Sequence, residues 1–325
     1  MYRLTTVSKT KLKAAIKECI KLSNDCSRGP KRPIGDWDVS AVKDMTNMFR
    51  DVQAFNGDIS KWDVSPVTNM QSMFFGAKSF NGDISKWDVS AVTEMKSVFS
   101  GASTFNGDIS KWNVSAVTDM RYMFYHAKSF NGDISKWDVS AVTGMQGLFS
   151  GANTFNGDIS KWNVSAVTGM GYMFDDAENF KGDISKWDVS AVTNMQYMFA
   201  DAWKFNGDIS KWDVSAVPDM ENMFNGAEDF NRDISKWNVS LVTDMSSMFY
   251  SAYAFKQTLC GAWVVSKANR GSIYLPDGTM FDESQGKLCS SALLTCFCDR
   301  SPYLPHFSLA LVSISLVTFC ENVYF

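Results

Sequence analysis

Tryptophan recurs every 25 residues along most of this 325-residue chain, and this fixed spacing restricts the possible folds more than any other feature. The nine positions, with no insertion or deletion between them, are Trp37, Trp62, Trp87, Trp112, Trp137, Trp162, Trp187, Trp212 and Trp237. Phenylalanine keeps the same spacing in two registers, from Phe49 to Phe249 and from Phe55 to Phe255. A sequence period of this length is typical of a solenoid, in which each repeat packs against its two neighbours.

One repeat, NGDISKWDVSPVTNMQSMFFGAKSF from Asn56 to Phe80, changes its apolar spacing halfway along. Ile59, Trp62 and Val64 have the spacing of a leucine-rich repeat, whose short strand turns alternate side chains inward. The following apolar residues recur at intervals of three and four, as on one face of a helix. They are Val67, Met70, Met73, Phe74 and Ala77. We therefore predict an α/β solenoid of nine leucine-rich-repeat-like coils, each a short strand followed by a short helix, with the strands of neighbouring coils parallel.

Polar residues at the predicted element boundaries agree with this pattern. Ser65, like its equivalents from Ser40 to Ser240, precedes the helical spacing, where a hydroxyl can cap a helix N-terminus. Gly76 follows the helical spacing, where a residue in the left-handed conformation ends a helix. Asn81 lies in the turn before the strand, and asparagine recurs there in most coils. We expect these amides to form a ladder that satisfies backbone groups of the adjacent coil.

The segments outside the repeats have their own compositions. Residues 1–33 contain SKTKLKAAIKECIKLS, predicted to be an amphipathic helix that caps the first coil, with a basic membrane-surface helix as the alternative. The repeats occupy residues 34–255, and residues 256–303 form a predicted C-terminal cap that contains cysteines. Residues 304–325 form an apolar tail whose main apolar segment, LPHFSLALVSISLVTF, has 16 residues with a proline and several hydroxyls among them, fewer than the ~20 of a spanning helix. The alternatives for this tail are a packed or disordered segment, a membrane segment and a lipid-anchoring signal.

All seven cysteines lie outside the repeats. Cys260 and Cys289 are a candidate disulfide pair if the protein occupies an oxidising compartment. An odd total leaves at least one thiol unpaired within the chain. Cys296 and Cys298 form a lone C-x-C without the paired spacing of a zinc site, so we predict no metal.

Charge and histidine content argue against several classes of function. The net charge of −4 gives no basic field that would attract nucleic acid. The chain has two histidines, His126 and His306, which disfavours histidine-centred metal sites and Ser-His or Cys-His catalysis. We expect no enzymatic activity, no cofactor and no nucleic-acid partner.

Two rows of charged residues repeat along the predicted strand face. Lys86 belongs to a lysine row and Asp88 to a row of aspartates and asparagines, with Lys86 and Asp88 two residues apart in the third coil. The opposite charges are expected to pair in a solvated lattice, each pair contributing ~0.2–1 kcal/mol. The alternative is a periodic surface that binds a periodic partner such as a polysaccharide or a mineral lattice.

The copies differ most at exposed positions in and after the predicted helix. Candidate interaction residues there are Tyr125, Asp175, Asp176, Trp203 and Lys204. Trp203 is the strongest single candidate because exposed tryptophans often dominate protein interfaces.

The run GDISKWDVSAVTNMQYMF, from Gly182 to Phe199, resembles the BspA-like leucine-rich-repeat surface proteins. Their unit is also known as a mycoplasma-lipoprotein repeat and as a domain of unknown function. The resemblance covers roughly residues 10 to 260. It implies a secreted or surface-displayed binding and adhesion scaffold, without catalytic residues.

We therefore expect a non-enzymatic scaffold that binds a protein or a polysaccharide at the cell surface or outside the cell. No signal-peptide core opens the sequence, so the alternative is an intracellular, cytoplasmic structural or assembly module without a small-molecule ligand. Attachment to a membrane through residues 304–325 is a further possibility, though a weaker one.

Overall fold

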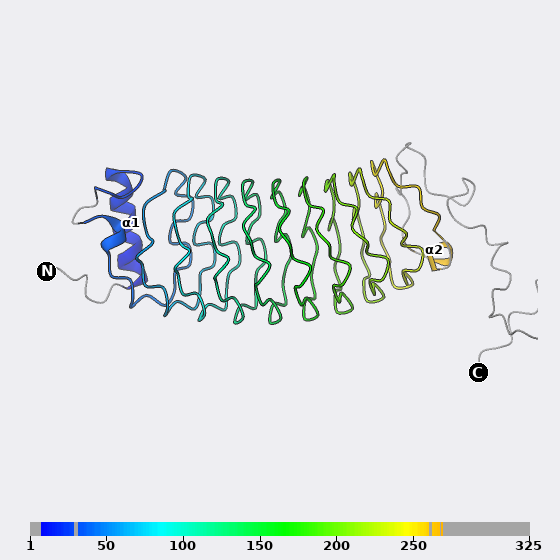
Figure 1. The fold of residues 1–325 in the computed structure, drawn as a ribbon, viewed down its shortest axis with the longest axis horizontal. Helices are drawn as coiled ribbons and strands as arrows, with labels where there is room; N and C mark the ends of the chain where they lie inside the picture. Colours follow the sequence, from blue (N-terminus) through cyan, green and yellow to red (C-terminus); the bar gives the residue numbers. More distant parts are fainter. Residues whose placement is uncertain (1–7, 29–31, 260–261, 267, 269–325) are drawn as a thin grey trace, which may run out of the picture. The chain divides into compact units, whose positions relative to one another are not determined.

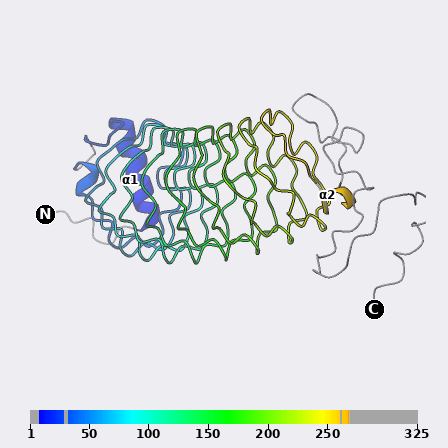
Figure 2. The same ribbon diagram turned by 45° about the vertical axis from the view of Figure 1, so that its right-hand side comes forward.

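Successive 25-residue coils stack side by side through the repeats (Figures 1 and 2). The computed structural model describes residues 8–28, 32–259, 262–266 and 268. Its elements are helix α1 (Lys9–Leu22), the 3₁₀ helix η1 (Ile34–Asp36) and helix α2 (Ala262–Val265). Cys260, Cys289 and the apolar tail lie outside the described residues, so the disulfide and membrane predictions made for them stay predictions. Among the described residues, no helix combines the length and apolarity needed to cross a membrane.

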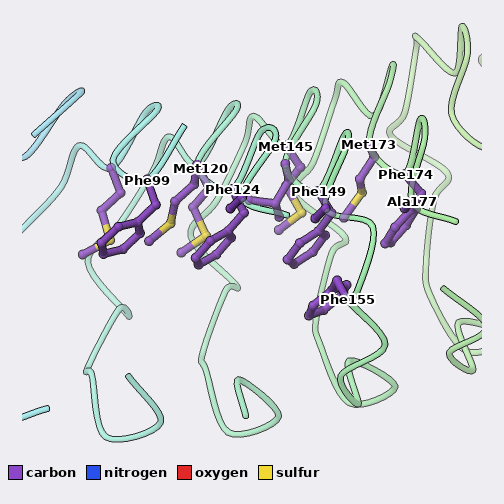
Figure 3. Packing of buried hydrophobic residues seen from close by; sticks show 14 of the residues in the cluster. Phe99, Met120, Phe124, Met145, Phe149, Phe155, Met173, Phe174 and Ala177 are labelled. Carbon is purple, nitrogen blue, oxygen red and sulfur yellow. The ribbon is translucent and has the colours of Figure 1, made fainter. Parts of the chain in front are cut away.

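The core consists of apolar side chains that point into every coil, as the sequence predicts. In the second coil Ile59, Trp62 and Met70 are at most 3% exposed, and their equivalents in the other coils are buried too. Phenylalanine rings stack from coil to coil, and Figure 3 shows Phe99, Phe124, Phe149 and Phe174 of one such row. The ring centroids of Phe124 and Phe149, in neighbouring coils, lie 5.7 Å apart with nearly parallel planes. Each coil thus covers the apolar face of the next.

The predicted helix in each coil is wrong. Within the described residues, α-helix is confined to α1 and α2, and the segment Asn69–Ala77, called here the Met segment together with its equivalents, is a run of turns. The N–H groups of Met70 and Ser72 donate to the carbonyls of Glu94 and Lys96 in the next coil. The next N–H, that of Met73, donates to the carbonyl of Met70 three residues back, and the N–H of Phe74 donates again to the next coil, at Val98. Backbone N–H groups therefore alternate between the neighbouring coil and the same coil, whereas a helix would keep them all within itself.

Backbone conformation explains why no helix forms there. Ser72 has φ of 54° and Gly76 has φ of 68°, in the left-handed region, and this pair recurs four residues apart in every coil. Right-handed helices need negative φ at every residue. The second position holds glycine, or an aspartate or histidine that tolerates the left-handed region, in every coil but the ninth, which has Ser251. The other eight are Asp51, Gly76, Gly101, His126, Gly151, Asp176, Asp201 and Gly226. The recurrence of these residue types at one position therefore argues against a helix in the sequence itself.

The predicted strand is also misplaced. The parallel pairing of neighbouring coils is confirmed, but the isolated parallel bridges join Met segments, for example Asn69 with Glu94. The segment Asp58–Ser65, called here the Trp segment together with its equivalents, uses its backbone N–H groups locally instead: Ser60 donates to the Asp58 carboxylate and Trp62 to the Ile59 carbonyl. The face with Lys61 and Asp63 is therefore a row of turns and not a strand surface.

Side chains connect the Trp segments from coil to coil. The indole N–H of Trp87 donates to the carbonyl of Ile59 at 3.2 Å, and the equivalent bond recurs along the stack. The predicted asparagine ladder is confirmed, because the N–H of Asn81 donates to the side-chain oxygen of Asn56 at 2.9 Å. The ladder is interrupted at Lys181, whose N–H still donates to Asn156 but whose side chain has no amide oxygen to continue the row.

The serines predicted as helix caps stabilise turns. Both the N–H and the hydroxyl of Ser65 donate to Oδ1 of Asp63. Ser115 does the same to Oδ1 of Asn113, because an amide oxygen accepts these bonds as a carboxylate oxygen does. The mixed aspartate and asparagine row therefore has a structural cause in the turn itself.

Helix α1 covers the first coil through the predicted apolar face. Leu12, Ile16 and Cys19 are buried in the same cluster as the coils, and the N-cap Ser8 accepts a bond from the N–H of Lys11. The chain then turns so that Cys19 meets Cys26, with Cα atoms 5.2 Å apart, the separation of a disulfide. This pair was not among the predicted disulfides.

Candidate interaction groove

A groove of about 430 Å³ crosses the Met segments of the second to sixth coils. Its aromatic lining consists of Phe75, Tyr122, Tyr125 and Tyr172. Its polar lining consists of Ser97, Ser100, Ser150 and Asp175. All eight come from the run of turns that bonds coil to coil, so the groove has a rigid floor.

The tyrosines present ring faces and edges to the groove. Tyr125 and Tyr172 are 36% and 37% exposed, which places them among the exposed large apolar side chains of the described residues. Tyr122 and Tyr125 meet edge to face with centroids 5.9 Å apart, and Tyr172 stacks on Tyr197 at 4.7 Å. These contacts hold the rings in place before any ligand arrives, which lowers the entropy cost of binding.

Small residues in the third and fifth coils create the hollow between the aromatic coils. Ser100 and Ser150 are 2% and 1% exposed and form the floor. In the fifth coil Gly147 lies against the ring of Tyr122. A Cβ at this position would stand 2.4 Å from a ring carbon of Tyr122, so the ring leaves room for no side chain there. Large and small residues thus alternate between coils at equivalent positions, and the hollow follows from that alternation.

Asp175 is the carboxyl group of the groove. The hydroxyl of Ser150 donates to its Oδ2 at 3.1 Å. The pKa of Asp175 is raised to about 6, mainly by burial and to a smaller extent by the charges of Asp176 and Asp201, against the lowering effect of the Ser150 hydrogen bond. Near neutral pH this carboxyl group can therefore either accept or donate a hydrogen bond.

Unfolding free energy is expected to depend on pH through Asp175. Its folded pKa of about 6 exceeds the ordinary aspartate value of 3.8, so stability increases as the pH falls from about 7 towards 4. Allowing for its partial exposure, we expect the free energy of unfolding to be about 1 kcal/mol higher at pH 5 than at pH 7.5. Asp175→Asn, which keeps the acceptor for Ser150, should remove most of this difference in denaturant titrations. An undiminished difference in the variant would contradict the assignment.

Below pH 4 the turn aspartates reverse this trend. Hydrogen bonds from the serine two residues on, through its hydroxyl and its N–H, lower the pKa of many of these carboxyl groups, including Asp83, Asp88, Asp133 and Asp138. Their stabilising contribution is complete above the unfolded value and is lost as the pH falls through the folded value. The same titrations should therefore show a steep loss of stability in acid for both the parent protein and Asp175→Asn.

The structure brings together two of the predicted interaction residues, Tyr125 and Asp175. Asp176 follows in the same turn, where its N–H donates to the carbonyl of Ala200. Trp203 is 43% exposed and Lys204 donates to the side-chain oxygen of Asn179, both in the loop after the Met segment and outside the groove lining.

Lys86 and Asp88 lie on the Trp segment, away from the groove lining. Asp88 accepts the N–H of Ser90 at 3.0 Å, so its repetition serves the turn. The predicted ion-pair lattice is wrong for the described residues: of the lysine row, Lys61 forms an ion pair, with Asp36 at 3.7 Å.

The sequence analysis missed the other groove residues because it considered the exposed residues of each coil separately. The missed residues are Phe75, Ser97, Ser100, Tyr122, Ser150 and Tyr172. Comparing equivalent positions across neighbouring coils would have shown the alternation of large and small residues. In the described part of the chain, no group of three potential metal ligands comes together.

Comparison with known proteins gives the repeats a family. The family model described as "Mycoplasma protein of unknown function, DUF285" matches residues 17–132, 108–202 and 179–287. A comparison with the curated proteins found no match. Among solved structures, the "Crystal structure of TLR13-ssRNA13 complex" is similar at 10% identity and a TM-score of 0.25, over 83% of this chain and 43% of that chain. The family matches overlap and together run through all the repeats, so the chain belongs to the DUF285 family of Mycoplasma proteins of unknown function.

Proposed function

We propose that the protein is a non-enzymatic, surface-type binding and adhesion scaffold whose groove receives an extended glycan. The observation that carries this proposal is the combination of exposed tyrosine rings with buried hydroxyl groups in one groove across several coils. Sugar rings have apolar C–H faces that pack on aromatic rings, and hydroxyl groups that pair with serine and carboxyl oxygens. A groove that crosses coils suits a chain-like ligand better than a compact one.

The groove chemistry favours binding over catalysis. Glycoside hydrolysis uses two carboxyl groups on either side of the bond that breaks. Among the residues that line the groove, Asp175 is the one with a carboxyl group. A single carboxyl group that hydrogen-bonds Ser150 can hold a sugar hydroxyl without cleaving the sugar.

A surface location is supported by the resemblance to BspA-like proteins and by a cysteine pair that joins α1 to the segment after it. Cys19 and Cys26 are both fully buried with Cα atoms 5.2 Å apart, and disulfides of this kind persist in oxidising compartments. Protease treatment of intact cells should cleave the native protein if it is displayed. Complete protection in intact cells, with cleavage after lysis, would favour the intracellular assembly alternative.

Binding to immobilised glycans tests the groove directly. Tyr125→Ala and Tyr172→Ala should each weaken binding at least tenfold, because each removes an exposed ring that would pack on a sugar. Tyr250→Ala is the matched control: Tyr250 occupies the position of Tyr125 five coils further on, is 48% exposed and lies outside the groove lining. Equal loss of binding in all three variants, or in none, would refute the groove as the glycan site.

A further inference from the structure

A second groove, separate from the first, runs between helix α1 and the first coil. Its volume is about 740 Å³, and its lining is mainly apolar. Ile16 and Ile20 contribute from the helix, and Met48 and Val52 from the coil. Ile20 and Val52 are only partly buried, so this surface is not fully covered by the described residues.

Four lysines line this groove at every fourth position of α1, which places them on one side of the helix about 6 Å apart along its axis. They are Lys9, Lys13, Lys17 and Lys21. Like charges four residues apart destabilise an isolated helix, so helix formation alone does not account for this row.

The ends of the lysine row are neutralised and its centre is not. Lys9 pairs with Asp44 and Lys21 with Glu18, both at 2.8 Å. Within the described residues, Lys13 and Lys17 form no ion pair. On the opposite wall Arg50 pairs with Asp51 at 3.4 Å, and its guanidinium group lies over the ring of Phe75, so this wall carries no net charge. The groove thus has an apolar floor and, at Lys13 and Lys17 on its α1 side, a positively charged rim.

We propose that this groove binds an amphipathic helix with an acidic face, supplied by a partner protein. The apolar side of such a helix would pack on Ile20, Met48 and Val52, as helices pack into apolar grooves elsewhere. Carboxylates spaced every fourth residue would match the lysine row. The two lysines that form no ion pair with any described residue, Lys13 and Lys17, lie one helical turn apart beside the apolar floor, which fits a ligand with several spaced negative charges better than a fatty acid, whose single charge lies at one end.

Fluorescence anisotropy with a designed helical peptide tests this proposal. The probe is a labelled 18-residue peptide with leucines on one face and glutamates every fourth residue beside them, and its controls are a scrambled peptide of the same composition and the corresponding lysine peptide. The full-length protein should bind the amphipathic glutamate peptide, at least tenfold more tightly than either control, and binding should weaken as salt rises.

Charge reversal at the centre of the row provides the protein-side test. Lys13→Glu/Lys17→Glu should weaken binding of the glutamate peptide at least tenfold. The matched variant Lys11→Glu/Lys43→Glu changes net charge equally at exposed lysines outside this groove, and should bind nearly as the parent protein does. Equal weakening in both variants would show only a general charge effect and would overturn the proposal.

Lipid probes separate the proposal from its nearest rival. Oleate and vesicles containing phosphatidylserine are tested with the same variants. If either lipid binds in a manner that depends on Lys13 and Lys17 while the glutamate peptide does not bind, the groove is a lipid site and the proposal is wrong. Circular dichroism of each variant confirms that α1 and the coils remain folded.

Discussion

Phe149→Ala is expected to lower the free energy of unfolding by about 3–5 kcal/mol. Phe149 is fully buried in the fifth coil, and its ring stacks on Phe155 of the same coil at 3.9 Å. It also lies between Phe124 and Phe174, 5.7 and 5.8 Å away in the neighbouring coils (Figure 3). Truncation would therefore leave a cavity lined by rings from three coils, each fixed by its own neighbours and unable to collapse into the space.

Urea denaturation followed by circular dichroism measures this loss. Tyr253→Ala is the control, because Tyr253 is 57% exposed and its removal should change the free energy of unfolding by less than about 0.5 kcal/mol. A loss below about 1 kcal/mol for Phe149→Ala would show that the phenylalanine row contributes little to the stack.

The buried positions could be predicted from the sequence because the recurring apolar residues become buried whether the backbone forms helices or turns. Met70, Met73 and Phe74 are buried as expected, although they are not on a helix. Their spacing of three and four arises equally from tandem turns with bonds three residues back, such as Met73 to Met70. Periodicity alone cannot separate the two; the left-handed positions at Ser72 and Gly76 do.

Helix α1 was predictable because its signals are local. Its N-cap Ser8 and its apolar face are contained in one short segment. The groove across the coils was not, because its hollow depends on residues 25 positions apart: Tyr122 leans over Gly147, and Ser150 bonds Asp175. Such relations appear only when the coils are set side by side.

Deleting residues 81–105, the whole third coil, is expected to leave a cooperative fold. Asn106 would then follow Phe80, and the contacts of the repeat would re-form one coil back. The N–H of Asn106 would donate to Asn56, as that of Asn81 does now, and the indole of Trp112 would reach the carbonyl of Ile59. The stack would lose one coil's contribution to stability, with all remaining neighbours in register.

Deleting residues 81–92, which removes fewer residues, should destabilise the protein more. The remaining half coil, residues 93–105, cannot complete a turn around the core. At best it is extruded as a loop of 13 residues, at a closure cost of about 3 kcal/mol, while Met95, Phe99 and Phe105 lose their burial. Urea denaturation of the two deletion variants therefore shows whether the free energy of unfolding depends more on the register of the repeats or on the number of residues removed. A half-coil variant as stable as the whole-coil variant would show that the coils do not depend on register, and that the bonds from one coil to the next are not what holds the stack together.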